Sequence, residues 1–359
     1  MVVVAASTPS LALLVFSLIV AIYLLAPFVI FNYIPSHPFL HERSDSSTTT
    51  RLRVEERPLA SEHISPSDHL SLRTAAMTMT NQSLPRNPLN SADIALCLIV
   101  KDDVDLEEWV QYHVNLGVRK IYVFDNNSTH PLLLPVLHPF IANGHVEYQY
   151  LSDPIPPAAL QGLPNQQLYA YQRCIREFGE RHEFMGFIDS DEFIVVKNRS
   201  STLLDILAEF RDYGGLTLNW MIFGSSGHVT RPNGGVLKNY FKCRPDHHLK
   251  SIVNLKFVRD VSGDPHHFKY KDGYFAVDTN FTAVPGSHNP GLTSPIPSYL
   301  YEKLYLNHYF TKSKEDFLNK VRRGQADSKT PRSKDVIDRV DAQCAGTCEI
   351  LQMPTPTIR

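Results

Sequence analysis

One stretch of the chain reads Phe184-Met185-Gly186-Phe187-Ile188-Asp189-Ser190-Asp191-Glu192-Phe193, an apolar run that ends in three carboxylates. The length and aromatic content of the run are those of a buried strand. We therefore expect the carboxylates where a strand leaves the core and opens into a cleft. Asp189 and Asp191 can turn together toward one hard divalent cation, and oxygen ligands suit Mg²⁺ or Mn²⁺. The alternative is a solvated acidic turn, because a bare Asp-x-Asp is common by chance.

Outward from this stretch, strands and helices alternate. Apolar runs predict strands at 94–100, 120–124, 145–151 and 184–188, and helical spacing predicts helices at 102–116 and 166–178. This alternation predicts a doubly wound α/β layer with a mostly parallel sheet. Such sheets bind ligands at the carboxyl ends of their strands, where Asp125 and Asp189 both fall. Further along, we expect a helix at 202–210, apolar or strand-like runs at 215–223, 253–258, 274–277 and 304–310, and a basic helix from Ser313.

Composition narrows the class of protein. The chain has 359 residues, a formal net charge of −2 and 20% charged residues. This nearly neutral composition gives no electrostatic argument for nucleic-acid binding, which requires a basic face. Five cysteines are too few for a disulfide scaffold in a chain of this length. Cys97 lies in an apolar run and is expected to be a core thiol. Cys344 and Cys348 are close enough to pair, although spacing alone does not show that they do.

The N-terminal part of the chain differs in composition from the rest. The first forty residues contain no Asp, Glu, Lys or Arg, and 11–31 is long and apolar enough to span a bilayer as a helix. We expect a retained signal-anchor in 1–40 rather than a cleaved signal peptide or a buried helix. Residues 41–91, rich in Ser, Thr and Pro, predict a disordered stem. A globular domain is expected at 92–330 and a C-terminal tail at 331–359.

Several ordered segments of the globular part resemble glycosyltransferase family 92, or a related family 2-like group. They are CLIVKD at 97–102 leading into LEEWVQYH at 106–113, YVFDNNS at 122–128, FIDSDEF at 187–193, WMIFGSSGH at 220–228 and NHYFTKS at 307–313. Their order and spacing are more specific than the Asp-x-Asp alone. The resemblance implies a GT-A fold, a nucleotide-sugar donor and a divalent metal, Mn²⁺ or Mg²⁺. Characterised galactosyltransferases of the family suggest UDP-galactose and inversion at the sugar.

The resemblance also implies roles for single residues. Asp189, Asp191 and His308 are the candidate metal ligands, although His308 is equally well read as a packed core histidine. Asp125 and Asn126 are candidate contacts to the nucleoside, with a simple turn after a strand as the alternative.

Asp189 and Arg322 are candidate contacts to the nucleotide sugar. Arginine suits bidentate contacts to phosphate, but a basic helix is more often a solvated face.

The catalytic base is the least determined role. An inverting enzyme needs a carboxylate or an imidazole within hydrogen-bond reach of the acceptor hydroxyl. Asp278, His228 and His267 lie in the half of the chain expected to bind the acceptor, as does His266, and the sequence does not rank them. Trp220 and the glycine-containing loop after it are a candidate platform for a sugar ring, or simply core and turn.

The implied partners are a nucleotide-sugar donor, a glycan or glycoprotein acceptor and a membrane reached through the N-terminal helix, with no nucleic acid. The layout resembles that of Golgi type II enzymes and implies a single-pass protein of a Golgi or other secretory-pathway membrane, with a lumenal catalytic domain. Two alternatives remain: a degenerate GT-A domain that binds glycans or partners, and a nucleotidyltransferase. The second needs a glycine-containing phosphate loop near the first strand, which residues 98–101 lack.

Overall fold

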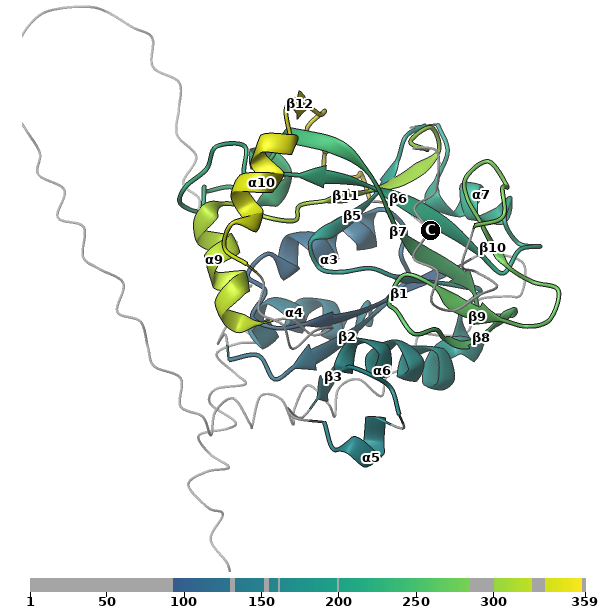
Figure 1. The fold of residues 1–359 in the computed structure, drawn as a ribbon. Helices are drawn as coiled ribbons and strands as arrows, with labels where there is room; N and C mark the ends of the chain where they lie inside the picture. The colour runs from purple at the N-terminus through teal and green to yellow at the C-terminus, as the bar shows by residue number, and fades with distance from the viewer. Residues whose placement is uncertain are drawn as a thin grey trace, which may run out of the picture. The chain divides into compact units, whose positions relative to one another are not determined.

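A computed structural model shows the fold of the chain (Figure 1). It describes residues 93–129, 133–151, 155–160, 162–198, 200–284, 300–324 and 333–356. The predicted anchor at 1–40 and the predicted stem at 41–91 lie outside these ranges. Within the ranges, no helix has both the length and the apolar character needed to cross a membrane.

The domain is a mixed α/β structure built on one curled, mostly parallel sheet (Figure 1). The strands lie in the order β3-β2-β1-β4-β7-β6-β11-β5, with β10 paired to β6 and β12 paired to β7. The bounds along this order are β3 Val146–Leu151, β2 Lys120–Asn126, β1 Ile94–Val100, β4 Phe184–Phe187, β7 Lys242–Asn254, β6 Gly215–Phe223, β11 Leu304–His308 and β5 Glu192–Val196. Two short strands complete it, β10 Ala276–Val277 and β12 Gly346–Thr347. The α/β class and the mostly parallel sheet predicted from the sequence are confirmed.

The parallel half consists of β3, β2, β1 and β4. Every residue of β1 is buried, as expected for a central parallel strand covered on both faces. Alternate side chains enter two different cores: Leu96 and Leu98 pack on the side of α3 (Leu106–Asn115) and α4 (Leu133–Ala142). Ala95 and Ile99 pack on the side of α6 (Gln166–Arg173). Helices therefore cover both faces of this half.

Beyond β4 the sheet becomes mixed. Strand β7 pairs antiparallel with β4 and β6, β11 pairs parallel with β6, and β5 closes the edge antiparallel to β11. The pairing of β5 with β11 brings the segment after Asp191 beside His308. The remaining elements are α5 Pro157–Leu160, η1 Cys174–Phe178, η2 Gly179–Arg181, α7 Leu203–Ala208, α8 Val236–Asn239, β8 Val258–Val261, β9 Phe268–Tyr270, α9 Lys314–Arg323 and α10 Val336–Gln343.

Some predicted bounds are wrong. A strand expected at 253–258 is in fact the end of β7 and the start of β8, which belong to different sheets. Helix α4 escaped prediction because it contains Pro139, a residue that normally breaks helices. Strand β5 was also missed, although four of its five residues, 193–196, are apolar.

The cysteine interpretation also requires correction. Cys97 is not a free core thiol but forms a disulfide with Cys174, and Cys348 pairs with Cys243 rather than with Cys344. Cys344 is a buried free thiol. The partners lie 77 and 105 residues apart, so only the fold brings them together.

The segment expected to form a tail contacts the domain where the structure describes it. Strand β12 pairs with β7, and Val340 of α10 packs against Ile222 of β6.

Candidate functional site

Two adjoining pockets lie around the Asp-x-Asp stretch. The first, which we call the central pocket, has a volume of about 380 Å³ and lies at the carboxyl ends of β1, β2 and β4. Its lining includes Ile99, Lys101, Asn126, Gln167, Asp189, Asp191, Trp220, His248, Lys250, His266, His308, Phe310, Lys320 and Arg323. The predicted cleft after the strand that ends before Asp189 is therefore present.

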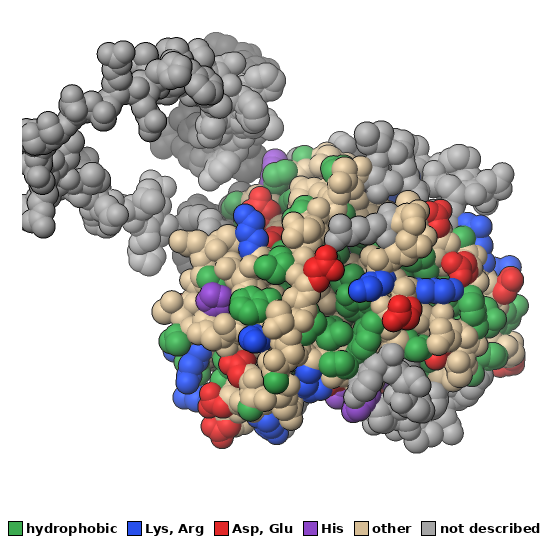
Figure 2. Space-filling model, turned by 90° about the horizontal axis from the view of Figure 1, so that it is seen from above, with side chains coloured by type: hydrophobic (Ala, Val, Ile, Leu, Met, Phe, Trp, Pro, Cys, Tyr) green, Lys and Arg blue, Asp and Glu red, His purple; other side chains and the backbone are tan. Residues whose placement is uncertain are grey.

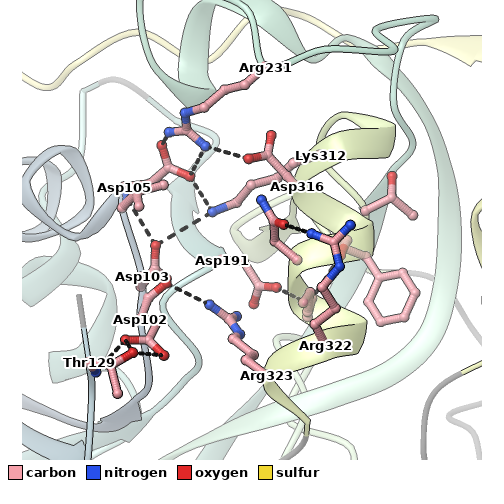
Figure 3. Close-up of a pocket in the computed structure, with 15 residues that line it drawn as sticks. Asp102, Asp103, Asp105, Thr129, Asp191, Arg231, Lys312, Asp316, Arg322 and Arg323 are labelled. Carbon is pink, nitrogen blue, oxygen red and sulfur yellow. Dashed lines mark hydrogen bonds and ion pairs between the residues drawn. The ribbon is translucent and has the colours of Figure 1, made fainter.

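The second, which we call the α9 pocket, has a volume of about 470 Å³ and lies between α9 and the loop that leads into α3 (Figure 3). Its lining includes Asp102, Asp103, Asp105, Thr129, Asp191, Arg231, Lys312, Asp316, Lys320, Arg322 and Arg323. Asp191, Phe310, Lys320 and Arg323 line both pockets. A charged ligand in either pocket would therefore meet the same carboxylate and the same cations.

Asp189 is held by partners on two other elements. Its Oδ1 accepts a hydrogen bond from Gln167 Nε2 at 2.9 Å, and its Oδ2 accepts one from Lys250 Nζ at 2.9 Å. Burial alone would lower the pKa of Lys250, but the charges of Asp189 and Glu192 outweigh burial and hold that pKa well above its ordinary value. The Asp189 side chain remains 34% exposed, which leaves it open to a ligand in the central pocket.

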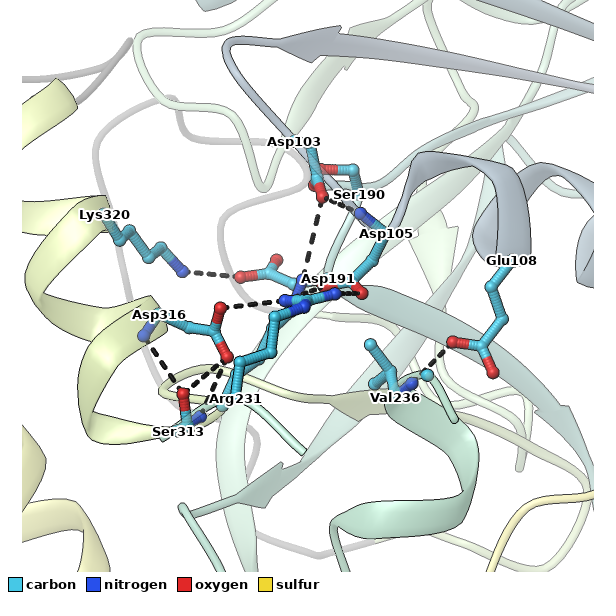
Figure 4. Close-up of polar contacts among 12 residues, drawn as sticks. Asp103, Asp105, Glu108, Ser190, Asp191, Arg231, Val236, Ser313, Asp316 and Lys320 are labelled. Atoms are coloured by element: carbon cyan, nitrogen blue, oxygen red, sulfur yellow. Dashed lines mark hydrogen bonds and ion pairs between the residues drawn. The ribbon is translucent and has the colours of Figure 1, made fainter. Parts of the chain in front are cut away.

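Asp191 is the more buried of the two aspartates, with 11% of its side chain exposed. Its Oδ2 accepts a hydrogen bond from Lys320 Nζ at 2.5 Å (Figure 4). Its Oδ1 lies 3.5 Å from His308 Nε2. Burial would raise the pKa of this carboxyl, but Lys320 and His308 outweigh it and hold the pKa well below the ordinary value. Asp191 is therefore an anion at neutral pH, paired with a lysine of α9.

His308 and Glu192 face each other behind the two aspartates. His308 Nδ1 lies 4.0 Å from Glu192 Oε1, and among the described residues neither buried atom has a hydrogen-bond partner. Burial lowers the pKa of His308, with Asp191 opposing, and burial raises the pKa of Glu192 well above its ordinary value. The site thus contains polar atoms whose hydrogen-bonding capacity is unused.

The donor types fit a hard divalent cation, since carboxylate oxygens and a neutral imidazole nitrogen are suitable ligands. The arrangement is not that of a finished metal site. Within the described ranges, no group of three His, Cys, Asp or Glu side chains is placed to hold a metal ion. Lys250 and Lys320 contact the carboxylates of Asp189 and Asp191 instead. A cation bound to Asp191 would have to displace the ammonium group of Lys320.

A charge network fixes α9 beside the aspartates (Figure 4). Lys312 Nζ lies 2.5 Å from Asp105 Oδ2 and 3.8 Å from Asp103 Oδ1. Arg231 contacts Asp105 and also lies 2.8 Å from Asp316 Oδ1. Asp316 belongs to the capping box that starts α9, so the network holds the helix that carries Lys320 and Arg323.

The predicted nucleoside contacts separate into two groups. Asp125 is 1% exposed and accepts hydrogen bonds from the Ser128 backbone N–H at 2.7 Å and from the Tyr148 hydroxyl at 2.5 Å. It does not line either pocket, and these bonds stabilise the turn after β2. Asn126 does line the central pocket, and its buried Oδ1 has no partner among the described residues.

Arg322, the predicted phosphate contact, lines the α9 pocket and donates to Asn319 Oδ1 at 2.7 Å. Its neighbour Arg323 lines both pockets and donates to the Asp102 carbonyl oxygen at 3.0 Å. Arg323 therefore lines both pockets together with Asp191, whereas Arg322, the arginine chosen from the sequence, lines only the α9 pocket (Figure 3).

None of the three candidate bases lines either pocket. Asp278 accepts hydrogen bonds from the backbone N–H groups of Asn280 and Thr282, at 2.8 and 3.0 Å. His228 Nε2 is 3.1 Å from the Asn239 carbonyl oxygen.

His267 Nδ1 is 3.2 Å from Asp264 Oδ1, so this histidine too is engaged by its own loop. The base roles of Asp278, His228 and His267 stay predictions that the pocket geometry does not support.

Sequence reasoning missed Lys250, Gln167 and His248. Lys250 had a signal, because it is the one charged residue in 249–253, a segment that also contains Leu249, Ile252 and Val253. Buried lysines are rare unless paired. The other two have no sequence signal of this kind, since each is a polar residue in a segment with other polar residues.

The fold and the pockets define an α/β protein in which a polar pocket lies where parallel strands end. The model of glycosyltransferase family 92 matches residues 96–335, and the chain belongs to that family. The match confirms the resemblance found in the ordered sequence segments and the enzyme class expected from it, glycosyltransferase.

Relatives with the same family description are found in plants. One from Ricinus communis is 30% identical over an alignment of 183 residues, and the match covers 47% of this chain and 30% of that protein. One from Oryza sativa subsp. japonica is 30% identical over an alignment of 188 residues, and the match covers 50% of this chain and 30% of that protein. One from Arabidopsis thaliana is 26% identical over an alignment of 184 residues, and the match covers 47% of this chain and 30% of that protein. The matched part of this chain thus spans about 30% of each relative's length.

Among solved structures, HddC from Yersinia pseudotuberculosis is 11% identical and covers 64% of this chain and 97% of its own, with a TM-score of 0.30. A likeness this low carries no argument about fold or function.

Proposed function

We propose that this chain is a GT-A glycosyltransferase that transfers a sugar from a nucleotide sugar to a hydroxyl of a glycan or glycoprotein. Galactose from UDP-galactose is the donor to test first, with inversion at the anomeric carbon. The observation that carries the proposal is the position of Asp191 at the junction of two pockets, beside Lys320 and Arg323. A diphosphate has the charge to interact with those cations.

The residues of the central pocket suggest how the donor lies. We assign the nucleoside contacts to Asn126 and Lys101, which line this pocket at the ends of β2 and β1. We assign the diphosphate contacts to Lys320 and Arg323, since both line the pocket and an arginine can bind a diphosphate with two parallel hydrogen bonds. Trp220 offers an indole beside the pocket on which a sugar ring can pack. This arrangement orients the donor and stabilises negative charge on the leaving group.

Asp189, Asp191 and His308 are the residues that would hold Mn²⁺ or Mg²⁺. A bound divalent ion would supply charge stabilisation to the leaving diphosphate. If the carboxylates held such an ion, the ammonium groups of Lys250 and Lys320 would no longer be needed by Asp189 and Asp191 and could contact anionic oxygens of the donor. The two lysines would thus act as counter-ions of the empty site and as phosphate ligands of the loaded one.

The location proposed for the protein is a Golgi or other secretory-pathway membrane, with the N-terminal helix as the single span and the domain in the lumen. The disulfides Cys97–Cys174 and Cys243–Cys348 support this, because disulfides persist in oxidising compartments. On the face seen in Figure 2, Lys and Arg side chains are interspersed with Asp and Glu rather than gathered in one basic patch. The partners proposed are accordingly sugars and a membrane, not nucleic acid.

The test is a screen of nucleotide sugars, each measured for binding and for release of the nucleotide, with Mn²⁺ present or chelated. We expect turnover of at least one donor that depends on the metal. Turnover that persists in chelator would contradict the metal part of the proposal alone.

Lys250 is paired with Asp189, and Lys320 is paired with Asp191. These pairs favour a second candidate function, that of a binding module without catalytic activity. Tight donor or glycan binding with no turnover under any condition would favour that module. Transfer of a nucleotidyl group from a nucleoside triphosphate would instead indicate a nucleotidyltransferase.

A further inference from the structure

Strand β7 carries extra residues opposite the middle of β6. The pairs Asn219–Leu249 and Met221–Pro245 enclose one residue of β6 but three of β7, residues 246–248. Such a bulge bends its strand and turns side chains away from their regular alternation, and bulges are over-represented next to active sites.

The bulge is fixed by a tyrosine from the segment before β11. The Asp246 backbone N–H donates to the Tyr301 hydroxyl at 3.1 Å, and that hydroxyl donates to the Trp220 carbonyl oxygen at 2.9 Å. Two backbone groups that the interrupted ladder leaves unpaired are thereby satisfied. The bulge is therefore a defined conformation.

Within the bulge, an aspartate orients a histidine. His248 Nδ1 lies 2.5 Å from Asp246 Oδ1, which also accepts the His248 backbone N–H at 3.0 Å. Arg244 fixes the other carboxylate oxygen of Asp246 from 2.7 Å. The side chain of Asp246 is 5% exposed and that of His248 is 64% exposed. A buried carboxylate thus holds one ring nitrogen of an accessible imidazole, and Nε2 makes no hydrogen bond to the described residues.

His248 lines the central pocket and is linked to the aspartates through one aromatic ring. The Trp220 ring stacks on His248, with centroids 5.2 Å apart, and meets His308 edge-on at 4.3 Å. His308 in turn contacts Asp191. A sugar packed on Trp220 would therefore lie between the diphosphate contacts on one side and the His248 imidazole on the other.

We propose that His248 is the general base of the transfer reaction and that Asp246 is its positioning residue. This inference rests on the proposed function. The acceptor O–H gives its proton to His248 Nε2 while its oxygen forms a bond to the anomeric carbon of the donor. The bond from that carbon to the β-phosphate oxygen breaks, and its electron pair leaves with the nucleoside diphosphate. The imidazolium then loses its proton to solvent.

The charges around His248 suit this role. The hydrogen bond from Asp246 raises the pKa of His248, while partial burial and Arg244 oppose the rise. A second histidine that lines the pocket is His266, whose ring centroid lies 6.4 Å from that of His248. Burial and the charge of Lys250 lower its pKa to about 4, and its Nδ1 lies 2.6 Å from the Leu249 carbonyl oxygen. His266 is thus a half-buried, weakly basic group, whereas His248 is exposed.

The experiment uses the full chain in mild detergent with UDP-galactose and Mn²⁺. Release of UDP is measured with water alone and with methyl glycosides of galactose, glucose, N-acetylglucosamine and fucose as acceptors. We expect His248→Ala to lower kcat by roughly 10²- to 10⁴-fold, the usual contribution of a general base, with an unchanged Kd for UDP. Added imidazole should restore part of the rate. The matched control is His247→Ala, which removes the neighbouring imidazole of the bulge and should keep kcat.

A pH profile tests the role of Asp246. Activity requires neutral His248, so kcat/KM should fall as the pH drops through the pKa of this residue. Asp246→Asn removes the anion that raises that pKa, and the acid limb of the profile should move to lower pH. A limb that stays in place would contradict the positioning role.

The possible failures are distinguishable. If the unaltered chain releases UDP from no nucleotide sugar, the proposed function fails and this inference falls with it. If the unaltered chain is active and His248→Ala retains its rate, only the inference is overturned. If His248→Ala loses activity together with UDP binding and thermal stability, and imidazole restores none of it, the histidine is structural and the inference is again overturned.

Discussion

The ammonium group of Lys320 lies 2.5 Å from Asp191 Oδ2, and so a carboxylate expected to ligate a metal is paired with a lysine of α9. The same lysine also donates to the Phe310 carbonyl oxygen at 3.1 Å, which fixes its position at the junction of the two pockets. Binding of a cation to Asp191 and binding of Lys320 to Asp191 are therefore competing events, and each can be measured against the other.

Lys320→Met tests this competition. Without its lysine, the largely buried Asp191 loses its closest counter-ion, so in chelator the free energy of unfolding should fall by about 2 kcal/mol. Mn²⁺ should restore that loss and should bind more tightly than to the unaltered chain, because nothing has to be displaced. Calorimetric titration with Mn²⁺ and chemical unfolding give the two numbers. Lys314→Met, at an exposed lysine of the same helix, is the control, and equal Mn²⁺ affinity in both variants would rule the competition out.

Asp191→Asn keeps the shape of the side chain and removes the charge that a hard cation needs. Metal-dependent donor binding should disappear while the far-UV circular dichroism spectrum stays unchanged. Asp338→Asn, at an exposed aspartate of α10, should bind donor normally. Full activity of Asp191→Asn, or full activity of the unaltered chain in chelator, is incompatible with a metal role for this aspartate.

His308→Ala separates two readings of one buried imidazole. As a metal ligand, His308 should affect the Mn²⁺ concentration needed for half-maximal activity much more than it affects Tm. As a packed core residue, it should lower Tm and leave the metal requirement as it was. Both quantities are measured on one preparation, with the exposed His138→Ala as the control. The contact of His308 with Asp191, at 3.5 Å, favours the first outcome.

The free energy of unfolding should depend on pH through a different histidine, His113. It is fully buried between α3 and β5, and burial lowers its pKa to about 3, although a hydrogen bond to the Trp109 carbonyl opposes the shift. The folded chain therefore keeps this imidazole neutral where the unfolded chain binds a proton. This contribution is fully present above pH 6.5 and is lost as the pH falls toward 3, at about 1.4 kcal/mol per pH unit.

Chemical unfolding between pH 7.5 and 4.5 measures that slope. His113→Gln removes the titrating group and should flatten the profile over this range, apart from the slope of other groups such as His266. His138→Gln, at an exposed site, should leave the slope in place. An unchanged slope in His113→Gln would assign the pH dependence to other groups.

A chain that begins at Ser91 tests the predicted domain boundary. If the stem contributes no core, this shorter chain should be soluble and should unfold in one cooperative transition. Thermal unfolding followed by circular dichroism measures it, beside the full chain in detergent. Loss of the cooperative transition on deleting residues 1–90 would move the boundary toward the N-terminus.

The strands of the parallel half could be predicted because each is a local apolar run in the sequence, although helix α4 of the same half was missed. An apolar run such as 94–100 is buried on both faces and therefore reads as a strand, and Gly117 follows the helix that succeeds it. The mixed half was less predictable because its pairing is set by contacts between distant residues. Nothing near Glu192 shows that β5 will pair with β11, more than a hundred residues later.

The residues of the candidate site also fall into two groups: some are recognisable in the sequence, and others are brought together only by the fold. Asp189 and Asp191 were recognisable from their place after an apolar run. The partners that determine their charge, Lys250 and Lys320, come from β7 and α9 and are brought near only by the fold. His248 was hidden for another reason: a bulge in β7 presents it to the pocket, and a bulge leaves no periodic pattern in the sequence.

The bond between Cys243 and Cys348 makes a covalent ring out of the last third of the chain, since its ends are 105 residues apart. His248, His308 and Lys320 all lie inside this ring. A protease that cuts the backbone once between the two cysteines would leave both pieces attached, and the nicked protein would migrate as a single species until it is reduced.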